Sequence, residues 1–255
     1  MVERYRHPIF ALQYELSEGN AAHLEDLSWY EERLPITRKP ILEIAAGTGR
    51  VTRHLSVAGR RLIALDVGRP MLDRLRADPR TGVVPAVCAS MRALPFRDGT
   101  DLPAAFSAYN SLGCLLERAH LDETFGEVRR VLPPGRPFHF DVAIHRPADW
   151  TVPSRTFDWE EWTAPDGTRI RRRTTAAANL ERERLELDYD FRWRLPGVDG
   201  EATKRVHFAL NLWPPDVYVE TAERCGFAIR TMDERTYVGE SGRERMWAFV
   251  SMERR

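Results

Sequence analysis

The sequence is short of cysteine and of long apolar runs, and each shortage excludes a class of protein. Its 255 residues include only Cys88, Cys114 and Cys225, an odd number without C-x-x-C spacing. A disulfide framework and a zinc site are therefore not expected, and we predict no metal. No stretch approaches the roughly 18 apolar residues of a membrane-spanning helix, and the first residues include no apolar core of a signal peptide. We expect a soluble, cytoplasmic protein that does not bind a membrane.

A net charge is also missing. Lys+Arg and Asp+Glu both number 38, and a chain without a basic excess is not expected to bind nucleic acid. Only Lys39 and Lys204 are lysines, so nearly all of the positive charge is arginine, which we attribute to genome base composition. Hydrophobic residues make up 43% of the chain, which is enough for the core of one large domain or of a domain with a sizeable insertion.

Short apolar strands alternate with helical segments through the first half of the chain. Residues 3–34 are predicted to be helical, and Pro35 and Pro40 end that segment. Strands are then predicted at 40–46, 61–67, 82–89, 104–111 and 136–144, and helices at 49–59, 69–78 and 120–132. Alternation of this kind predicts parallel strands joined by right-handed crossovers, and thus an open α/β sheet.

Residues 147–213 follow a different pattern. Between Leu185 and Leu195 apolar and charged residues alternate, which predicts a half-buried antiparallel strand. A turn at 165–168 predicts a hairpin that leads into it, and 204–213 is predicted to be a further strand. We therefore divide the chain into an amino-terminal helical cap (1–35), a core (36–146), an antiparallel β insertion or lid (147–213) and a segment that completes the core sheet (214–255).

The stretch ILEIAAGTGR, residues 41–50, predicts a strand that turns sharply into a helix around a ligand. A dinucleotide fingerprint would need a third glycine after Gly47 and Gly49, and a phosphate loop would need Gly-Lys-Ser/Thr, whereas Arg50 follows here. S-adenosylmethionine, which has no phosphate, is the alternative ligand. The two glycines would permit close backbone approach, and Glu43 would accept from backbone amides and favour the ammonium group of the ligand. A structural turn without a ligand remains the other possibility.

Further candidates follow the strand ends, where open α/β sheets bind their ligands. Asp66 ends the second strand and could accept from both hydroxyls of a ribose; the alternative is an exposed helix-capping residue. Additional contacts are predicted for Met71 and Leu72 under the adenine, Ser90 and Met91 at its edge, and Tyr109, Asn110 and Ser111 facing the sulfonium.

These motifs, in this order, resemble those of the class I S-adenosylmethionine-dependent methyltransferases. E-x-A-x-G-T-G at 43–49 resembles the first motif of the family, LDV…ML at 65–72 the ribose motif, and MRALPF and NSLGCLL…VRRVLPPG the later ones. The resemblance covers residues 36–146 strongly. Over residues 214–255 it extends only to the pattern of predicted helix and strands. Ala45 replaces a common glycine, Ser90 stands where the family usually has Asp, and Pro103 stands where the fourth strand usually opens with Asp.

The resemblance implies a methyltransferase with an open, seven-stranded, mostly parallel Rossmann-like sheet, an antiparallel β insertion and bound S-adenosylmethionine. The cofactor-binding residues that it implies are Tyr14, Glu43, Ala45, Ala46, Gly47, Thr48, Gly49, Asp66, Val67, Met71, Ser90, Met91, Tyr109 and Asn110.

The insertion is similar in pattern to that of small-molecule N-methyltransferases acting on amino sugars and glycine-type amines. This implies a small-molecule acceptor, with an amine nitrogen favoured. A homodimer is possible, although the sequence does not reveal the oligomeric state. The alternatives are an O-methyltransferase acting on a small hydroxylated natural product and a non-catalytic protein that kept the fold. Methylation of nucleic-acid bases would call for a D/N-P-P-Y element after the fourth strand, and AYNSLG lacks it.

Two side chains are candidates for catalysis. Tyr14 lies on the amino-terminal segment, which in similar enzymes folds over the cofactor, and its phenol could orient an amine; the alternative is a core tyrosine. His145 follows the fifth strand and could act as a base, which would favour O-methylation; the alternative is a polar loop residue. Tyr5 is a second, weaker candidate for the role proposed for Tyr14. His207 could face the pocket or the solvent. Asp141 is expected to have a structural or cofactor-adjacent role and not a catalytic one.

The insertion is also rich in rings and arginine. Its tryptophans, which could line an acceptor pocket or form the lid core, are Trp150, Trp159, Trp162, Trp193 and Trp213. The run at 169–175, RIRRRTT, could bind an anionic acceptor, although a solvated strand face is the simpler interpretation.

Overall fold

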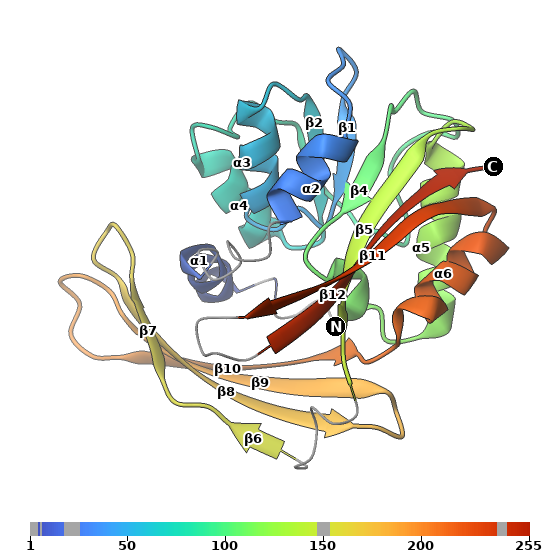
Figure 1. Cartoon of the computed structure of the whole chain (residues 1–255). Coiled ribbons are helices and arrows are strands. Elements are labelled where there is room, and N and C mark those ends of the chain that lie inside the picture. Colours follow the sequence, from blue (N-terminus) through green and yellow to red (C-terminus); the bar gives the residue numbers. More distant parts are fainter. Residues whose placement is uncertain (1–4, 6, 18–25, 147–153, 239–243) are drawn as a thin grey trace.

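The computed structural model describes residues 5, 7–17, 26–146, 154–238 and 244–255, and it contains a seven-stranded and a five-stranded sheet (Figure 1). The larger sheet has the order β11-β12-β5-β4-β1-β2-β3. Its strands are β1 (Ile41–Ile44), β2 (Leu62–Asp66), β3 (Ala86–Cys88), β4 (Ala105–Ser107), β5 (Pro137–Ile144), β11 (Phe227–Val238) and β12 (Glu244–Arg254). Pairing is parallel from β3 to β5, and β12 runs antiparallel to both β5 and β11. The α/β class with a mostly parallel sheet is thus confirmed.

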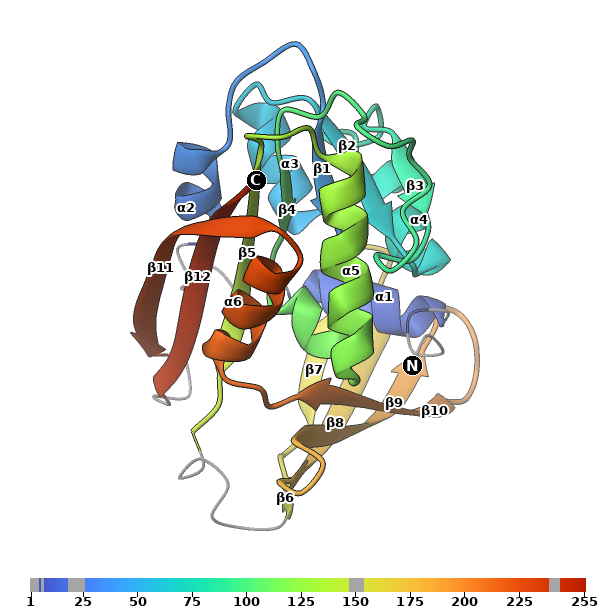
Figure 2. The ribbon, with the colours of Figure 1, turned by 90° about the vertical axis from the view of Figure 1, so that its right-hand side faces the viewer.

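Helices cover both faces of this sheet, so its central strands are buried on both sides, including the polar residues Glu43 and Asp141. The helices are α2 (Asp26–Arg33), α3 (Arg50–Val57), α4 (Arg69–Ala77), α5 (Arg118–Val131) and α6 (Pro215–Arg224). α5 and α6 pack on one face, and α2, α3 and α4 on the other (Figure 2). All four residues of β1 are buried between the two layers.

Two predicted strands are shorter than the sequence indicates. The fourth was predicted over 104–111 but ends at Ser107, because Tyr109 (φ 59°) and Asn110 (φ 54°) adopt left-handed conformations that no strand can contain. A short 3₁₀ helix, Ser111–Cys114, follows. The third, predicted over 82–89, begins only at Ala86, because the chain before it is folded into turns.

The amino-terminal segment, predicted to be helical over 3–34, contains two helices, α1 (Pro8–Leu16) and α2. α1 begins sharply because Pro8 occupies its first position and the His7 Nδ1 accepts from the Ile9 N–H at 3.3 Å. Residues 18–25 lie outside the described part of the chain. α1 lies between the larger sheet and the smaller one (Figure 1).

The smaller sheet is the antiparallel β insertion predicted from the sequence, and we call it the lid. Its strands are β6 (Ser154–Thr156), β7 (Glu160–Thr163), β8 (Arg169–Asn179), β9 (Arg184–Arg194) and β10 (Ala202–Asn211). All its pairings are antiparallel, and the predicted turn at 165–168 joins β7 to β8. Phe10 of α1 packs against Phe191 of the lid at a ring distance of 6.3 Å, so the cap and the lid share a small core.

The sequence predicts neither a disulfide framework nor a membrane-spanning helix. The three cysteines all lie in the described part of the chain and are thiols, not disulfide partners. Among the described helices, none combines the length and the apolar character needed to cross a bilayer.

Candidate active site

A cavity of about 660 Å³ lies at the carboxyl ends of the parallel strands, between the core, α1 and the lid. This volume falls in the range of roughly 300–1,000 Å³ that is usual for small-molecule sites. The predicted cofactor residues that line it are Tyr14, Ala45, Gly47, Asp66, Val67, Met71, Ser90, Met91, Tyr109 and Asn110. Tyr5, Ser111 and His145 line it as well.

Five predicted residues are not part of the lining. Four of them lie in or next to the glycine loop but do not reach the cavity surface: Glu43, Ala46, Thr48 and Gly49. The fifth, Leu72, is fully buried in the core. At Gly49 (φ 91°) an added Cβ would come within 3.0 Å of Leu75, so this glycine lets α4 pack against the loop.

The loop after β1 presents backbone to the cavity. Ala45 (φ 60°) and Gly47 (φ 58°) are both left-handed, and Ala45 occupies the position where a glycine is common in similar proteins. A Cβ at Gly47 would lie 3.6 Å from the Tyr14 ring, so the missing side chain leaves a slot between the loop and α1. That slot is where a ligand can approach bare backbone.

Asp66 is 5% exposed and connects the glycine loop to the start of α4. Its Oδ2 accepts from the Gly47 N–H at 2.8 Å, and its Oδ1 accepts from the Gly68 N–H at 2.7 Å. Asp66 also lines the cavity, and a carboxylate can accept several hydrogen bonds at once. The alternative of an exposed helix-capping residue is therefore wrong, because Asp66 is buried on the cavity wall and α4 has Gly68 as its N-cap without a side-chain capping bond.

Glu43 lies behind the glycine loop. Its Oε2 accepts from the Thr52 hydroxyl at 2.6 Å, and the side chain is buried. Burial raises the pKa of Glu43 to about 8, against the lowering effects of Thr52 and of the charge on Arg50. The carboxyl is therefore protonated at neutral pH in the protein without ligand.

The left-handed turn after β4 is held by Asp141, which is 1% exposed and lies behind the cavity. Its Oδ2 accepts from the Tyr109 N–H and its Oδ1 from the Asn110 N–H, each at 2.8 Å. The Tyr30 hydroxyl donates to Oδ2 at 2.7 Å. Burial, aided by the charge on Asp26, raises the pKa of Asp141 to about 6. Asp141 is thus structural, as expected, but it shapes the cavity wall.

The ring of Tyr109 is held from two sides. It stacks on Trp247 of β12 with a centroid distance of 5.6 Å, and the Arg50 guanidinium lies 5.2 Å from its centre. Asp26 in turn binds Arg50, with 2.9 Å between Oδ1 and Nη1. These contacts hold the Tyr109 ring in place at the cavity wall.

Both catalytic candidates reach the cavity. Burial, and then the neighbouring Tyr109, raises the pKa of Tyr14, so its phenol stays neutral and can orient a ligand but not act as a base. His145 extends from the end of β5. His207 instead lies on the outer face of the lid, 2.9 Å from Asp188.

The tryptophans that the structure describes in the insertion do not form the cavity wall. Trp159, Trp162, Trp193 and Trp213 are absent from its lining, and Trp150 lies outside the described residues. Trp247, which the sequence analysis missed, lines it from β12.

Other lining residues were also missed. They come from α1 and from the inner face of the lid, and include Phe10, Gln13, Ala176, Leu185, Leu187, Tyr189, Phe208 and Leu210; Arg172, from the run considered for an anionic acceptor, lines the cavity too. The alternating pattern places the odd-numbered apolar residues of β9 on one face, but it does not say that this face meets the cofactor edge.

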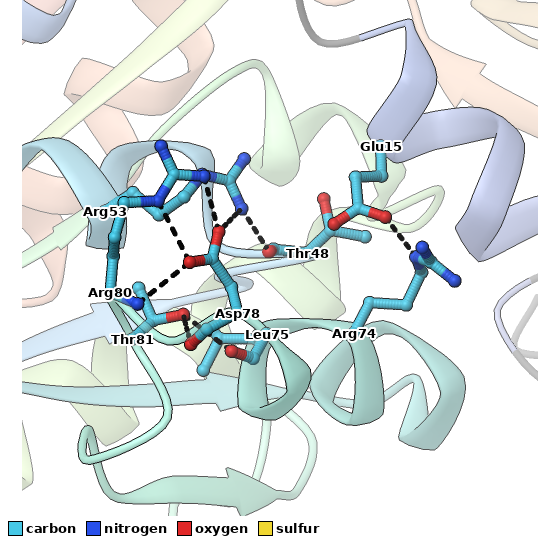
Figure 3. A network of polar contacts seen from close by, with 8 residues as sticks. All are labelled: Glu15, Thr48, Arg53, Arg74, Leu75, Asp78, Arg80 and Thr81. Atoms are coloured by element: carbon cyan, nitrogen blue, oxygen red, sulfur yellow. Dashed lines mark hydrogen bonds and ion pairs between the residues drawn. The ribbon is translucent and has the colours of Figure 1, made fainter. Parts of the chain in front are cut away.

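Polar contacts outside the cavity fix the helices around the loop (Figure 3). Glu15 of α1 forms an ion pair with Arg74 of α4. Arg53 of α3 donates to the Thr48 carbonyl at 2.9 Å and lies 3.6 Å from Asp78. The first of these contacts ties the cap to the core beside the cavity. Within the described residues, no three His, Cys, Asp or Glu side chains gather as a metal site would require.

Comparisons with known proteins agree with this geometry. Residues 41–135 match a family model described as a methyltransferase domain. The chain is 32% identical over 76 residues to the cypemycin N-terminal methyltransferase of a Streptomyces species. The matched residues make up 30% of this chain and 31% of that protein. The match thus spans less than a third of that relative's length.

Solved structures match over nearly the whole chain. The sugar N-methyltransferase KedS8 of a Streptoalloteichus species has a TM-score of 0.68 at 17% identity, over 96% of this chain and 92% of that one. CalS10, an amino pentose methyltransferase from Micromonospora echinaspora solved with bound S-adenosylmethionine, has a TM-score of 0.65 at 14% identity, over 92% and 95%. Residues 41–135 thus match a methyltransferase domain, and the chain as a whole shares the fold of these solved methyltransferases.

Proposed function

We propose that this protein transfers a methyl group from S-adenosylmethionine to an amine nitrogen of a small molecule. The observation that carries this proposal is the single cavity that joins the glycine loop, Asp66 and Tyr109 to the inner face of the lid. Such a cavity can hold a cofactor and an acceptor side by side.

Several residues fit the cofactor. The slot at Gly47 would admit its amino-acid part, and the Asp66 carboxylate on the cavity wall would bind the ribose hydroxyls. Met71, Ser90 and Met91 line the part of the cavity beyond Asp66, where the adenine would lie. When bound, the cofactor supplies an electrophilic methyl group on a sulfonium.

The chain's own contribution to catalysis would be orientation and exclusion of water. Tyr14 closes the cavity from α1 opposite Gly47, and its neutral phenol can hold a nucleophile in line with the methyl group. Holding two reactants in this way can supply several kcal/mol of the barrier reduction, up to about 7–11. An amine needs only to lose a proton, and His145 lies in the same cavity to accept one.

His145 is also the observation that favours the second candidate, methylation of a hydroxyl oxygen, because such an acceptor needs a base. We favour nitrogen, since the sugar N-methyltransferase KedS8 and the cypemycin N-terminal methyltransferase are named for that chemistry. A homodimer and a cytoplasmic location remain predictions.

A calorimetric titration followed by an acceptor screen tests the proposal. We expect one equivalent of S-adenosylmethionine to bind, NAD to produce no heat, and S-adenosylhomocysteine to accumulate with small amines. Turnover of alcohols but not of amines would favour the second candidate. Failure to bind the cofactor would refute both.

A further inference from the structure

The face of the lid that lines the cavity is apolar except at Glu160, Arg172, Thr174 and Tyr189, and its opposite face is charged. Because strand side chains alternate, the register of the lid determines which residues face inward. Phe208, Leu187 and Ala176 lie opposite one another across β10, β9 and β8, and all three line the cavity. Leu185 and Leu210 form the next inward row and line it too. Each of these side chains except Leu210 is less than 9% exposed.

Most of the arginine run at 169–175 faces away from the cavity. Arg171 pairs with Glu161 at 2.7 Å, and Arg173 with Asp190 at 3.2 Å, both on the outer face. These arginines are therefore not positioned to meet an acceptor in the cavity. An anionic acceptor in the cavity would therefore lack two of the arginine contacts that the sequence analysis considered, those with Arg171 and Arg173.

The remaining inward arginine, Arg172, is already neutralised. Its Nη2 binds Glu160, its Nη1 donates to the Gln13 Oε1 at 3.2 Å, and its guanidinium lies 4.5 Å from the centre of the Tyr189 ring. A phosphate bound here would have to compete with Glu160. Among the described lid residues that line the cavity, Arg172 and Glu160 are the only charged ones, and their charges cancel.

We propose that the amine acceptor has an apolar body, aliphatic or aromatic, that packs against Leu187, Phe208 and Ala176 while its nitrogen points to the cofactor. This inference deepens the proposed function and rests on it. Each CH₂ group buried in such a wall contributes a factor of about four in affinity. A polyhydroxylated or phosphorylated amine would leave hydroxyl or phosphate groups unpaired against the same wall.

Matched amines test the inference directly. We expect kcat/KM for cyclohexylamine and 2-phenylethylamine to exceed that for glucosamine and glucosamine 6-phosphate by at least tenfold. The reverse order, or equal values, would overturn the inference. Binding of the same four amines to the protein loaded with S-adenosylhomocysteine, followed by ligand-observed NMR, gives a second readout. If no apolar amine binds, the inference is wrong even if the cofactor binds normally.

Variants one residue apart provide the control. Leu187→Asn places a polar group on the cavity wall, and we expect it to lower kcat/KM for cyclohexylamine about tenfold. Asp188→Asn introduces the same residue on the outer face and should leave it within twofold. Since Leu187→Asn could impair folding, Ala176→Leu is the second variant: it should reduce activity with 2-phenylethylamine more than with methylamine. Equal reductions for both amines would contradict the inference. Unchanged cofactor affinity in these variants separates this result from failure of the proposed function.

Discussion

Replacing Asp141 by Asn tests whether a buried carboxylate shapes the cofactor site from behind. The carboxylate accepts from the N–H groups of Tyr109 and Asn110 and from the Tyr30 hydroxyl. An asparagine has one oxygen and an NH₂ that can only donate, so one backbone N–H would face a donor. A buried donor left unsatisfied costs about 1–3 kcal/mol. The turn is already disfavoured by its two left-handed residues, each costing roughly 1–2 kcal/mol.

The cost can appear in two quantities, and both should be measured. Part of it lowers the free energy of unfolding, read from urea denaturation, and the rest weakens cofactor binding, because the turn must be restored when the ligand binds. The two changes should sum to about 1–3 kcal/mol, with Kd for S-adenosylhomocysteine rising by up to roughly 150-fold. Tyr30→Phe is the control, since it removes a contact with the same carboxylate but leaves both backbone donors paired; it should leave Kd within twofold.

The pH dependence gives an independent readout. The pKa of Asp141 is raised from its usual 3.8 to about 6, so its contribution to stability is complete below pH 4 and is lost as the pH rises through 6. The affinity for the cofactor should change in the opposite sense and fall as the pH drops below about 6. The reason is that only the ionised Asp141 carboxylate accepts from both N–H groups. Asp141→Asn should show neither trend. A variant with wild-type stability, affinity and pH profile would refute this account of Asp141.

Four further predictions concern the same cavity. Asp66→Ala should weaken binding of S-adenosylmethionine by one to two orders of magnitude in a calorimetric titration, since it removes hydrogen bonds to a charged group worth about 1.5–3 kcal/mol; Asp73→Ala, on the exposed side of α4, should not. Tyr14→Phe should lower kcat and leave Kd for the cofactor nearly unchanged; full turnover would mean that Tyr14 only packs. Glu15→Gln breaks the ion pair between α1 and α4 and should raise Kd two- to fivefold, in keeping with a partly exposed pair worth about 0–1 kcal/mol. Glu43, with its pKa raised to about 8, should release a proton when a cationic cofactor binds near pH 7.5, seen as a buffer-dependent heat that Glu43→Gln abolishes.

The core and its loop were predictable because local rules determine them. Apolar runs separated by helical periodicity specified a parallel sheet. The glycine loop and Asp66, at the ends of neighbouring strands, line one cavity, and the binding role predicted for them stays a prediction. The lid followed from period-two alternation. In each case the neighbours along the chain carry the information.

Long-range contacts were not predictable in the same way. The fourth strand ends early because of Asp141, which is more than 30 residues away. The face of the lid that meets the cavity depends on how α1 packs against it, and Trp247 reaches the site only because β12 pairs with β5. A single sequence does not reveal such pairings.

A crystal structure with S-adenosylhomocysteine bound is the most direct test of the central claim. The account predicts both ribose hydroxyls on the Asp66 carboxylate, the amino-acid part of the ligand in the slot between Gly47 and Tyr14, and the sulfur atom facing the lid cavity. A ligand bound elsewhere, or a ribose held without Asp66, would contradict it.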